Sequence, residues 1–457
     1  MPLTFIRNAL LPIVLTSSLI LTAAAEPETM TVTAAREALN ISDLSNSLSR
    51  VLQRDLQLIS AVHISQTLSR VPGAWVNRGN GQESLIAIRS PVLTGAGSCG
   101  AFLIAEDGVA SRATGFCNVN QLFDINTEQA GGIEIVRGPG NEVHSSGAMH
   151  GVINVLSLAP SKIRQQLLSL EAGPNRFKRI KYSYSNTHDL HGYRLSFNGS
   201  SDDGYKDDSG YDQQKLNFRH DYSAAELTVR TLISATNINQ ETAGYVSGFE
   251  AYKDSNKKRL NPNPEAYRDS QSFRWQSRIS QMLANDHQLI ITPYLRYTNM
   301  AFAMHFLPGE PVEENGQNNA GVQLSYIQPI NDTLKITTGF DGEFTDAFLK
   351  QTQQGGFGPF PKGKQYDYQV DAIVAATFAS VDYQLNKATQ FNAGARFEYL
   401  QYDYDNRMID GNSDQNGAAC SPPSGCRYSR PGDRDDSFSD LSLNAGVVHQ
   451  LNDQHIL

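Results

Sequence analysis

The stretch Gly131–Leu158, GGIEIVRGPGNEVHSSGAMHGVINVLSL, decides the fold prediction for this 457-residue chain. It contains two β-prone runs, one around Ile133–Val136 and one at Gly151–Leu156, separated by the turn residues Arg137-Gly138-Pro139-Gly140. Glycines beside runs of valine and isoleucine mark tight turns or places where the backbone approaches another segment closely. The stretch therefore predicts two short strands that pack against other backbone.

Three upstream segments extend this pattern. In Leu68–Val76, LSRVPGAWV, a helix is predicted to stop at Pro72-Gly73 and a strand to begin after it. Two further strands are predicted at Leu85–Ser90 and Phe102–Val109. Together with the opening stretch, these motifs resemble the plug domain of TonB-dependent outer-membrane receptors, although Ser90 replaces the family's usual glycine. The resemblance implies an α/β plug domain over residues 36–160.

The first 25 residues carry the features of a secretory signal peptide. Arg7 precedes the apolar stretch Ala9–Leu21, and Ala23-Ala24-Ala25 forms a small-residue cleavage site. A single membrane anchor is the alternative, but the apolar stretch is short for a membrane span. We therefore expect the signal peptide to be removed and the mature chain to begin at Glu26.

Residues 26–35 resemble the TonB box, the short segment that a TonB-type periplasmic energy-coupling protein grips in this family. A β-prone strip on a flexible tether is suited to adding a strand to a partner's sheet edge. An unstructured N-terminus is the alternative. The residues assigned to the box are Glu28, Thr29, Met30, Thr31, Val32, Thr33 and Ala34.

From residue 161 to residue 457, apolar and polar side chains alternate in segments of roughly ten residues, which is typical of outer-membrane barrel strands. Tyr193, Leu195 and Phe197 on one face of such a segment, for example, alternate with polar neighbours. Short turns alternate with long polar insertions, the longest at 403–437. A soluble β-sandwich is the alternative, although the strands run long for one.

The predicted fold is therefore membrane β, with an N-terminal α/β plug inside an antiparallel transmembrane β-barrel. About ten to twelve strands fit into 161–457, whereas plugged transporters have about 22. We therefore expect a C-terminally truncated barrel, about half of a 22-stranded one. Outer-membrane lipid would surround it.

Composition and cysteine spacing narrow the function classes. A net charge of −9 argues against nucleic acid, because phosphate binding needs concentrated lysine and arginine. The four cysteines form two local pairs, Cys99 with Cys117 and Cys420 with Cys426, which predict disulfides in an oxidising compartment. A metal site is the alternative for the second pair, but it lacks a nearby histidine or a C-x-x-C spacing. We expect no metal and no cofactor.

Two groups of residues are candidates for function. The sequence contains no G-x-S-x-G or H-E-x-x-H motif, so we do not expect an enzyme. A glycine-rich loop, expected near the extracellular apex of the plug, is instead a candidate ligand contact, with a structural turn as the alternative. The candidate ligand contacts are Thr94, Gly95, Ala96, Gly97, Ser98 and Arg112, and the candidate plug–barrel ion pairs involve Arg89, Glu134 and Arg137. Local turn stabilisation is the alternative for these three charges.

The resemblance implies energy-coupled uptake across the outer membrane of a Gram-negative cell. We expect the ligand to be an iron chelate, specifically a ferric siderophore, with haem, cobalamin or another large solute as alternatives. A passive porin-like channel is less favoured, because a pore needs neither a folded N-terminal domain nor a TonB-box-like tether.

Overall fold

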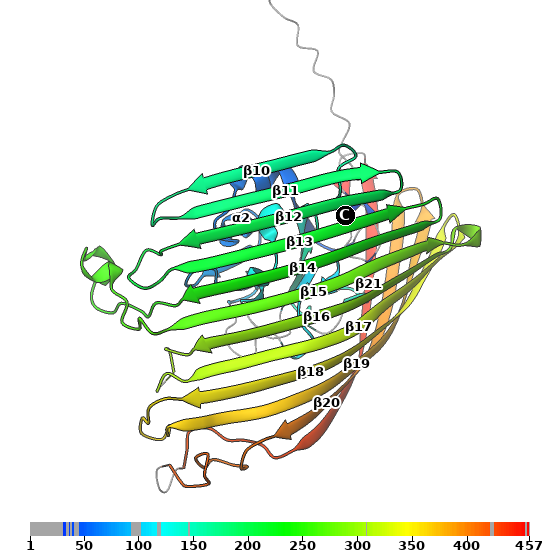
Figure 1. The fold of residues 1–457 in the computed structure, drawn as a ribbon. Helices are drawn as coiled ribbons and strands as arrows, with labels where there is room; N and C mark the ends of the chain where they lie inside the picture. Colours follow the sequence, from blue (N-terminus) through cyan, green and yellow to red (C-terminus); the bar gives the residue numbers. More distant parts are fainter. Residues whose placement is uncertain are drawn as a thin grey trace, which may run out of the picture.

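The computed structural model describes residues 31–32, 36, 39–40, 45–92, 102–116, 120–144, 147–307, 309–420, 425–452 and 455–456. It consists of a long, curved antiparallel sheet and a smaller N-terminal domain (Figure 1). The N-terminal elements, blue and cyan in Figure 1, lie on the side toward which the sheet curves.

The N-terminal domain is built on a five-stranded sheet in the order β3-β8-β9-β6-β7. The two strands predicted in the opening stretch are β8 (Gly132–Arg137) and β9 (Gly151–Leu156), which pair antiparallel. Strand β6 (Phe102–Glu106) runs parallel to β9, while β3 (Leu48–Leu52) and β7 (Val109–Ala110) complete the sheet. Position 151 needs a glycine, because a Cβ there would lie 2.6 Å from the carbonyl oxygen of Val136.

Short helices and a hairpin cover this sheet. They are α1 (Gln53–Ile59), α2 (Ser65–Leu68), β4 (Ala74–Arg78), β5 (Ser84–Ile88), η3 (Gln121–Asp124) and η4 (Thr127–Gln129). The chain turns after α2 at Gly73, whose φ of +82° suits glycine. The core between these layers is aliphatic and includes Leu68, Ile88, Ile125, Ile133, Ile135 and Ile153. Burying each such side chain stabilises the folded domain by about 1.5–3 kcal/mol. The cluster is therefore a hydrophobic core that belongs to the N-terminal domain itself.

In the part of the chain that the structure describes, the large sheet has thirteen strands that pair in chain order, each antiparallel to the next. They are β10 (Gln165–Ala172), β11 (Lys178–His188), β12 (His191–Asp202), β13 (Tyr211–Ser223), β14 (Leu227–Glu241), β15 (Tyr267–Met282), β16 (Gln288–Ala303), β17 (Val312–Asn331), β18 (Leu334–Gln353), β19 (Gly363–Asn386), β20 (Thr389–Asn406), β21 (Arg434–Asn452) and β22 (His455–Ile456). Strands β10 and β22 are the two edges of an open sheet. The predicted fold class, a plug domain with an unclosed antiparallel barrel sheet, is confirmed, while the total of 22 strands stays a prediction.

The alternation along each strand separates two faces. On β16, Leu295 and Tyr297 point outward and are 48% and 40% exposed, whereas Arg296 between them is buried toward the N-terminal domain. The two-residue period therefore gives an apolar outer band and a polar inner wall, as a barrel in a membrane requires. Among the described residues, no helix is both long and apolar enough to cross a bilayer.

The connections differ strongly in length at the two ends of the sheet. At one end the strands are joined by short turns such as 332–333 and 387–388, and at the other by loops such as 242–266 and 407–433. The structure joins Cys420 and Cys426 by a disulfide within the second of these loops. Cys99 and Cys117 lie outside the described residues.

Candidate functional site

The predicted TonB box is described at two of its seven positions. Thr31 and Val32 form β1 (Thr31–Val32), which pairs antiparallel with β2 (Leu39–Asn40). The other five positions, Glu28, Thr29, Met30, Thr33 and Ala34, lie outside the described residues. The part that is described has the extended conformation that strand addition needs, and the role of the segment stays a prediction.

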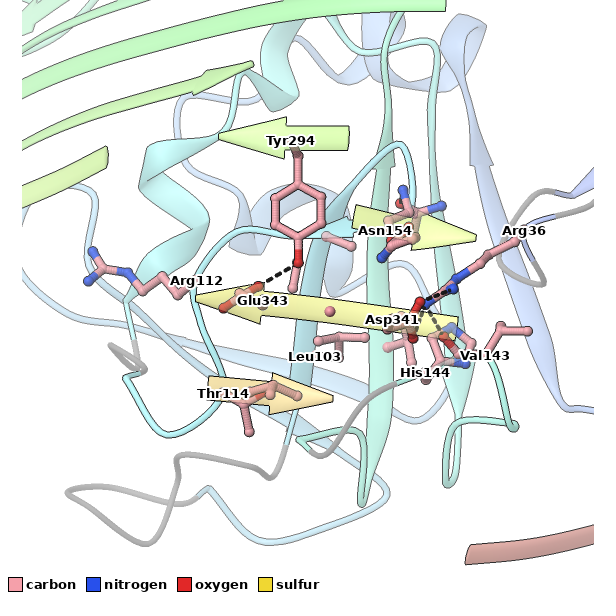
Figure 2. A pocket seen from close by; sticks show the side chains of 17 residues that line it. Arg36, Leu103, Arg112, Thr114, Val143, His144, Asn154, Tyr294, Asp341 and Glu343 are labelled. Carbon is pink, nitrogen blue, oxygen red and sulfur yellow. Dashed lines mark hydrogen bonds and ion pairs between the residues drawn. The ribbon is translucent and has the colours of Figure 1, made fainter. Parts of the chain in front are cut away.

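Arg36, four residues after Val32, connects this segment to both larger parts of the structure. Its Nη1 lies 2.5 Å from Asp341 Oδ1 on β18, and its Nη2 donates to the carbonyl oxygen of Val143 in the N-terminal domain at 2.6 Å. Its own carbonyl oxygen accepts a hydrogen bond from Arg278 Nη2 on β15 at 2.6 Å. Figure 2 shows the side chain of Arg36 reaching between Asp341 and Val143.

The ion pair of Arg36 with Asp341 is buried and shared. The side chains of the two residues are 9% and 13% exposed, and Arg396 donates to the same carboxylate at 2.7 Å. Arg396 is also paired with Glu398 at 2.8 Å. In addition, the backbone of Arg36 has a φ of +59°, which costs free energy for a residue other than glycine. The contacts of Arg36 hold it in this conformation.

A cavity of about 50 Å³ lies beside this ion pair, between the N-terminal domain and the wall formed by β16–β19. Tyr294 of β16 donates its hydroxyl to Glu343 Oε2 at 2.6 Å (Figure 2), and Arg296 pairs with the same carboxylate. The lining is polar for the most part. It includes Arg36, Arg112, Thr114, His144, Asn154, Tyr294, Gln323, Asp341 and Glu343, with Leu103, Ala105, Ala110, Val143, Val152 and Val374 as apolar members.

On the opposite side, three carboxylates of the N-terminal domain pair with cations of the β13–β15 wall. The pairs are Glu83 with Arg268 at 2.7 Å, Glu106 with Arg274 at 3.0 Å and Glu128 with Lys215 at 3.1 Å. Arg274 also donates to the carbonyl oxygen of Asp124 at 2.8 Å. Because all six side chains are largely buried, these pairs fix the domain to this wall in one position.

The three charges that the sequence assigned to plug–wall ion pairs make contacts within the N-terminal domain. Arg89 donates to Ser47 Oγ at 3.1 Å, and Arg137 donates to the Pro72 carbonyl oxygen at 3.0 Å. Glu134 Oε2 accepts a hydrogen bond from Asn154 Nδ2 at 3.0 Å. Sequence reasoning missed Glu83, Glu106 and Glu128. For Glu106 a signal was present, because a carboxylate in an otherwise apolar strand needs a buried partner.

Arg112 lies at the cavity with its charge already compensated. Its Nη2 pairs with Asp124 Oδ2 at 3.1 Å, and both side chains are buried. The remaining predicted ligand contacts, Thr94, Gly95, Ala96, Gly97 and Ser98, lie outside the described residues. A direct contact between Arg112 and a ligand stays a prediction.

A group of aromatic rings lies where the plug meets β20 and β21, near the end of the sheet with the long loops. Phe116 of the N-terminal domain lies 6.0 Å from the ring of Tyr402, which in turn lies 6.2 Å from the ring of Phe438. Tyr402 also donates its hydroxyl to the carbonyl oxygen of Thr114 at 3.1 Å. These rings offer flat surfaces on which an aromatic or sugar-like ligand can stack.

Two histidines of the N-terminal domain, His63 and His144, have strongly lowered pKa values. Burial, followed by the charge of Arg78, lowers the pKa of His63 to about 4. Burial, followed by the charges of Arg36 and Arg396, lowers the pKa of His144 to about 3. Both imidazoles are therefore neutral at physiological pH, and adding a proton to either requires a change in its surroundings.

This leads to a prediction for the pH dependence of stability. The unfolded chain binds a proton at His63 near pH 6.5, whereas the folded domain does so only near pH 4. The free energy of unfolding should therefore fall by about 3 kcal/mol through this residue as the pH drops from 6.5 to 4. Denaturant unfolding followed by the fluorescence of Trp75, with the barrel tryptophan removed by Trp275→Phe, measures this loss. His63→Gln should show a weaker pH dependence in this window, and equal slopes would contradict the prediction.

Two family models match the chain. Residues 40–152 match the TonB-dependent Receptor Plug Domain, and residues 307–423 match the Outer membrane protein beta-barrel family. The vitamin B12 transporter BtuB of Vibrio vulnificus (strain CMCP6) is 26% identical over 159 residues, covering 34% of this chain and 25% of that protein.

Solved structures share the fold at low sequence identity. The ferric citrate transporter FecA in its unliganded form superposes with a TM-score of 0.70 at 14% identity, covering 90% of this chain and 62% of that one. The ferric yersiniabactin uptake receptor FyuA from Yersinia pestis gives a TM-score of 0.68 at 16% identity, covering 90% and 63%. The chain thus spans less than two thirds of each of these proteins.

The plug-domain match falls on the N-terminal domain, and the barrel match falls on the large sheet. The same two parts are combined in the receptors that share the fold. The chain therefore carries the plug domain of TonB-dependent receptors together with a sheet of the outer-membrane β-barrel family.

Proposed function

We propose that this receptor takes up a scarce ligand across the outer membrane with energy supplied from the inner membrane. A TonB-type periplasmic protein would grip residues 28–34 by strand addition and pull. The plug would then rearrange and let the ligand pass.

The observation that carries this proposal is the placement of Arg36. Residues 28–34 form the predicted handle on which the partner pulls, and Arg36 follows this handle by two residues. Arg36 contacts both Val143 of the plug and Asp341 of the barrel wall. A pull on the handle is therefore applied directly to a contact that joins the two parts of the molecule. A passive pore has no use for such a connection.

For the ligand we propose a ferric siderophore, with haem, cobalamin or another large solute as alternatives. Receptors whose names state a ferric chelate are among the structures that share the fold, and the sequence relative is named as a vitamin B12 transporter. The ring surfaces of Phe116, Tyr402 and Phe438 support a large ligand with flat parts, because stacking on such rings favours extended ligands.

Deletion of residues 28–34 tests the proposed function. In a strain that lacks its own receptors, the full chain should restore growth on one or more of a ferric hydroxamate, a ferric catecholate, haem and cobalamin. The deletion variant should bind the same compound at the cell surface yet fail to import it. Import that survives the deletion would show that the handle is not used and that transport is passive.

A further inference from the structure

We infer that the transported solute passes along the β16–β19 wall, through the cavity beside Arg36, while the plug stays attached to the β13–β15 wall. This inference rests on the proposed function and adds the route and the residues that line it.

The first argument is the uneven distribution of charge pairs around the plug. Toward β13–β15, Glu83, Glu106 and Glu128 each pair with a cation of the wall. Toward β16–β19, in the part of the chain that the structure describes, the ion pair is that of Arg36 with Asp341. The β13–β15 wall is therefore held by plug carboxylates, and the β16–β19 wall by Arg36, which follows the handle.

The second argument concerns the remaining contacts on the β16–β19 side. They are hydrogen bonds between wall side chains and plug backbone: Arg296 donates to the Ala110 carbonyl at 2.6 Å, and Gln317 Oε1 accepts from the Ala113 amide at 3.1 Å. Such bonds exchange readily with water once the interface opens, whereas separating a buried ion pair leaves two charges to be solvated. The β16–β19 side should therefore part first.

The third argument is that the carboxylate of Asp341 still has an ionic partner on the wall after Arg36 leaves. Asp341 keeps the ion pair with Arg396 at 2.7 Å when Arg36 is withdrawn, and Arg396 keeps Glu398. By contrast, moving the plug away from the opposite wall would strand Arg274 and Lys215 without their carboxylates. The electrostatic cost of opening is thus smaller at β16–β19.

The fourth argument is the continuity of the route. Thr114 lines the cavity, and its carbonyl accepts the hydroxyl of Tyr402, which belongs to the ring surfaces near the long loops. The lining continues with Tyr294 and Glu343, which present a hydroxyl and a carboxylate group (Figure 2), and with the amide of Gln323. A second cavity, of about 10 Å³, lies at the β12–β14 wall and is lined by Arg194, Arg219 and Leu232. The cavity beside Arg36 is the wider of the two, and its hydroxyl, amide and carboxylate groups fit a hydrogen-bonding solute.

Thiol labelling in living cells tests this route without knowledge of the ligand. Val374→Cys lines the cavity at β19, and Leu232→Cys lines the second cavity at β14; the two native side chains are 7% and 2% exposed. The cells receive fluorescein maleimide together with a ferric hydroxamate, a ferric catecholate, haem and cobalamin. Labelling at position 374 should be at least fivefold higher in energised cells than in cells treated with a protonophore. Labelling at position 232 should stay at the level of the parent chain.

The outcomes separate the inference from the proposed function. A rise at position 232 without a rise at position 374 would place the route at the other wall and overturn the inference alone. If neither position responds to the protonophore, the plug is not moved by energy, and both the inference and the proposed function fail.

Matched cross-links provide a second test. Two pairs have the same geometry, a plug amide nitrogen bonded to a wall glutamine Oε1: Ala113 with Gln317 at 3.1 Å, and Gln82 with Gln240 at 3.0 Å. Joining the cysteines of an Ala113→Cys, Gln317→Cys variant with a short thiol-reactive cross-linker should abolish the response at position 374. The same cross-linker in a Gln82→Cys, Gln240→Cys variant should leave the response intact, and the reverse pattern would overturn the inference.

Discussion

Replacing Arg274 with methionine is expected to destabilise the plug by about 3–5 kcal/mol, because the change leaves a buried carboxylate without its partner. The side chains of Arg274 and Glu106 are 5% and 4% exposed, and two guanidinium nitrogens contact Glu106 Oε2 at 3.0 and 3.1 Å. The same guanidinium holds the carbonyl oxygen of Asp124. Methionine fills similar space but replaces neither interaction.

Hydrogen exchange of the β6 and β9 amides measures this effect, since these central strands exchange when the plug opens. A loss of about 3–5 kcal/mol corresponds to exchange about a hundredfold faster or more. The matched control is the double variant Arg274→Met with Glu106→Gln, which removes both charges and should recover much of the stability. If the single and double variants exchange at the same rate, the buried charge is not the cause.

The plug strands were predictable from the sequence because their signals are local. Strands β8 and β9 follow from runs of valine and isoleucine, and Gly151 fills a position where a side chain would strike the Val136 carbonyl. The barrel strands were predictable for a similar reason, since a period of two along one segment reveals an inner and an outer face. Each of these patterns is contained within a few neighbouring residues.

The partners across the plug–wall interface were not predictable in the same way. Glu106 and Arg274 are 168 positions apart, and Arg36 and Asp341 are 305 positions apart. Alternation shows that Arg274 and Asp341 point inward, but it does not say which part of the plug faces each strand. The charges chosen from the sequence, Arg89, Glu134 and Arg137, lie in the motif itself, where they contact the plug. Sequence reasoning also passed over Arg36, because it stands between two motifs and belongs to neither.

Replacing Asp341 with asparagine is expected to free Arg36 and the handle that precedes it. The carboxylate holds Arg36 at 2.5 Å and Arg396 at 2.7 Å, so its neutralisation leaves two neighbouring guanidinium groups without their shared counter-charge. Arg396 retains its ionic partner Glu398, whereas Arg36 retains hydrogen bonds, to the Val143 carbonyl and from Arg278, and keeps an unfavourable φ of +59°. Arg36 is therefore the group that should leave.

The release can be measured as the rate at which a maleimide labels Thr31→Cys in the purified receptor without ligand. Loss of a buried, charge-assisted contact supports at least a tenfold faster rate in the Asp341→Asn background, since tenfold corresponds to only about 1.4 kcal/mol. Glu398→Gln is the matched control, because it removes the carboxylate that pairs with Arg396 and leaves the contact of Arg36 with Asp341 in place. Its labelling rate should stay near that of the parent. If both variants label alike, the handle is held by something other than Asp341, and the connection from handle to wall does not run through Arg36.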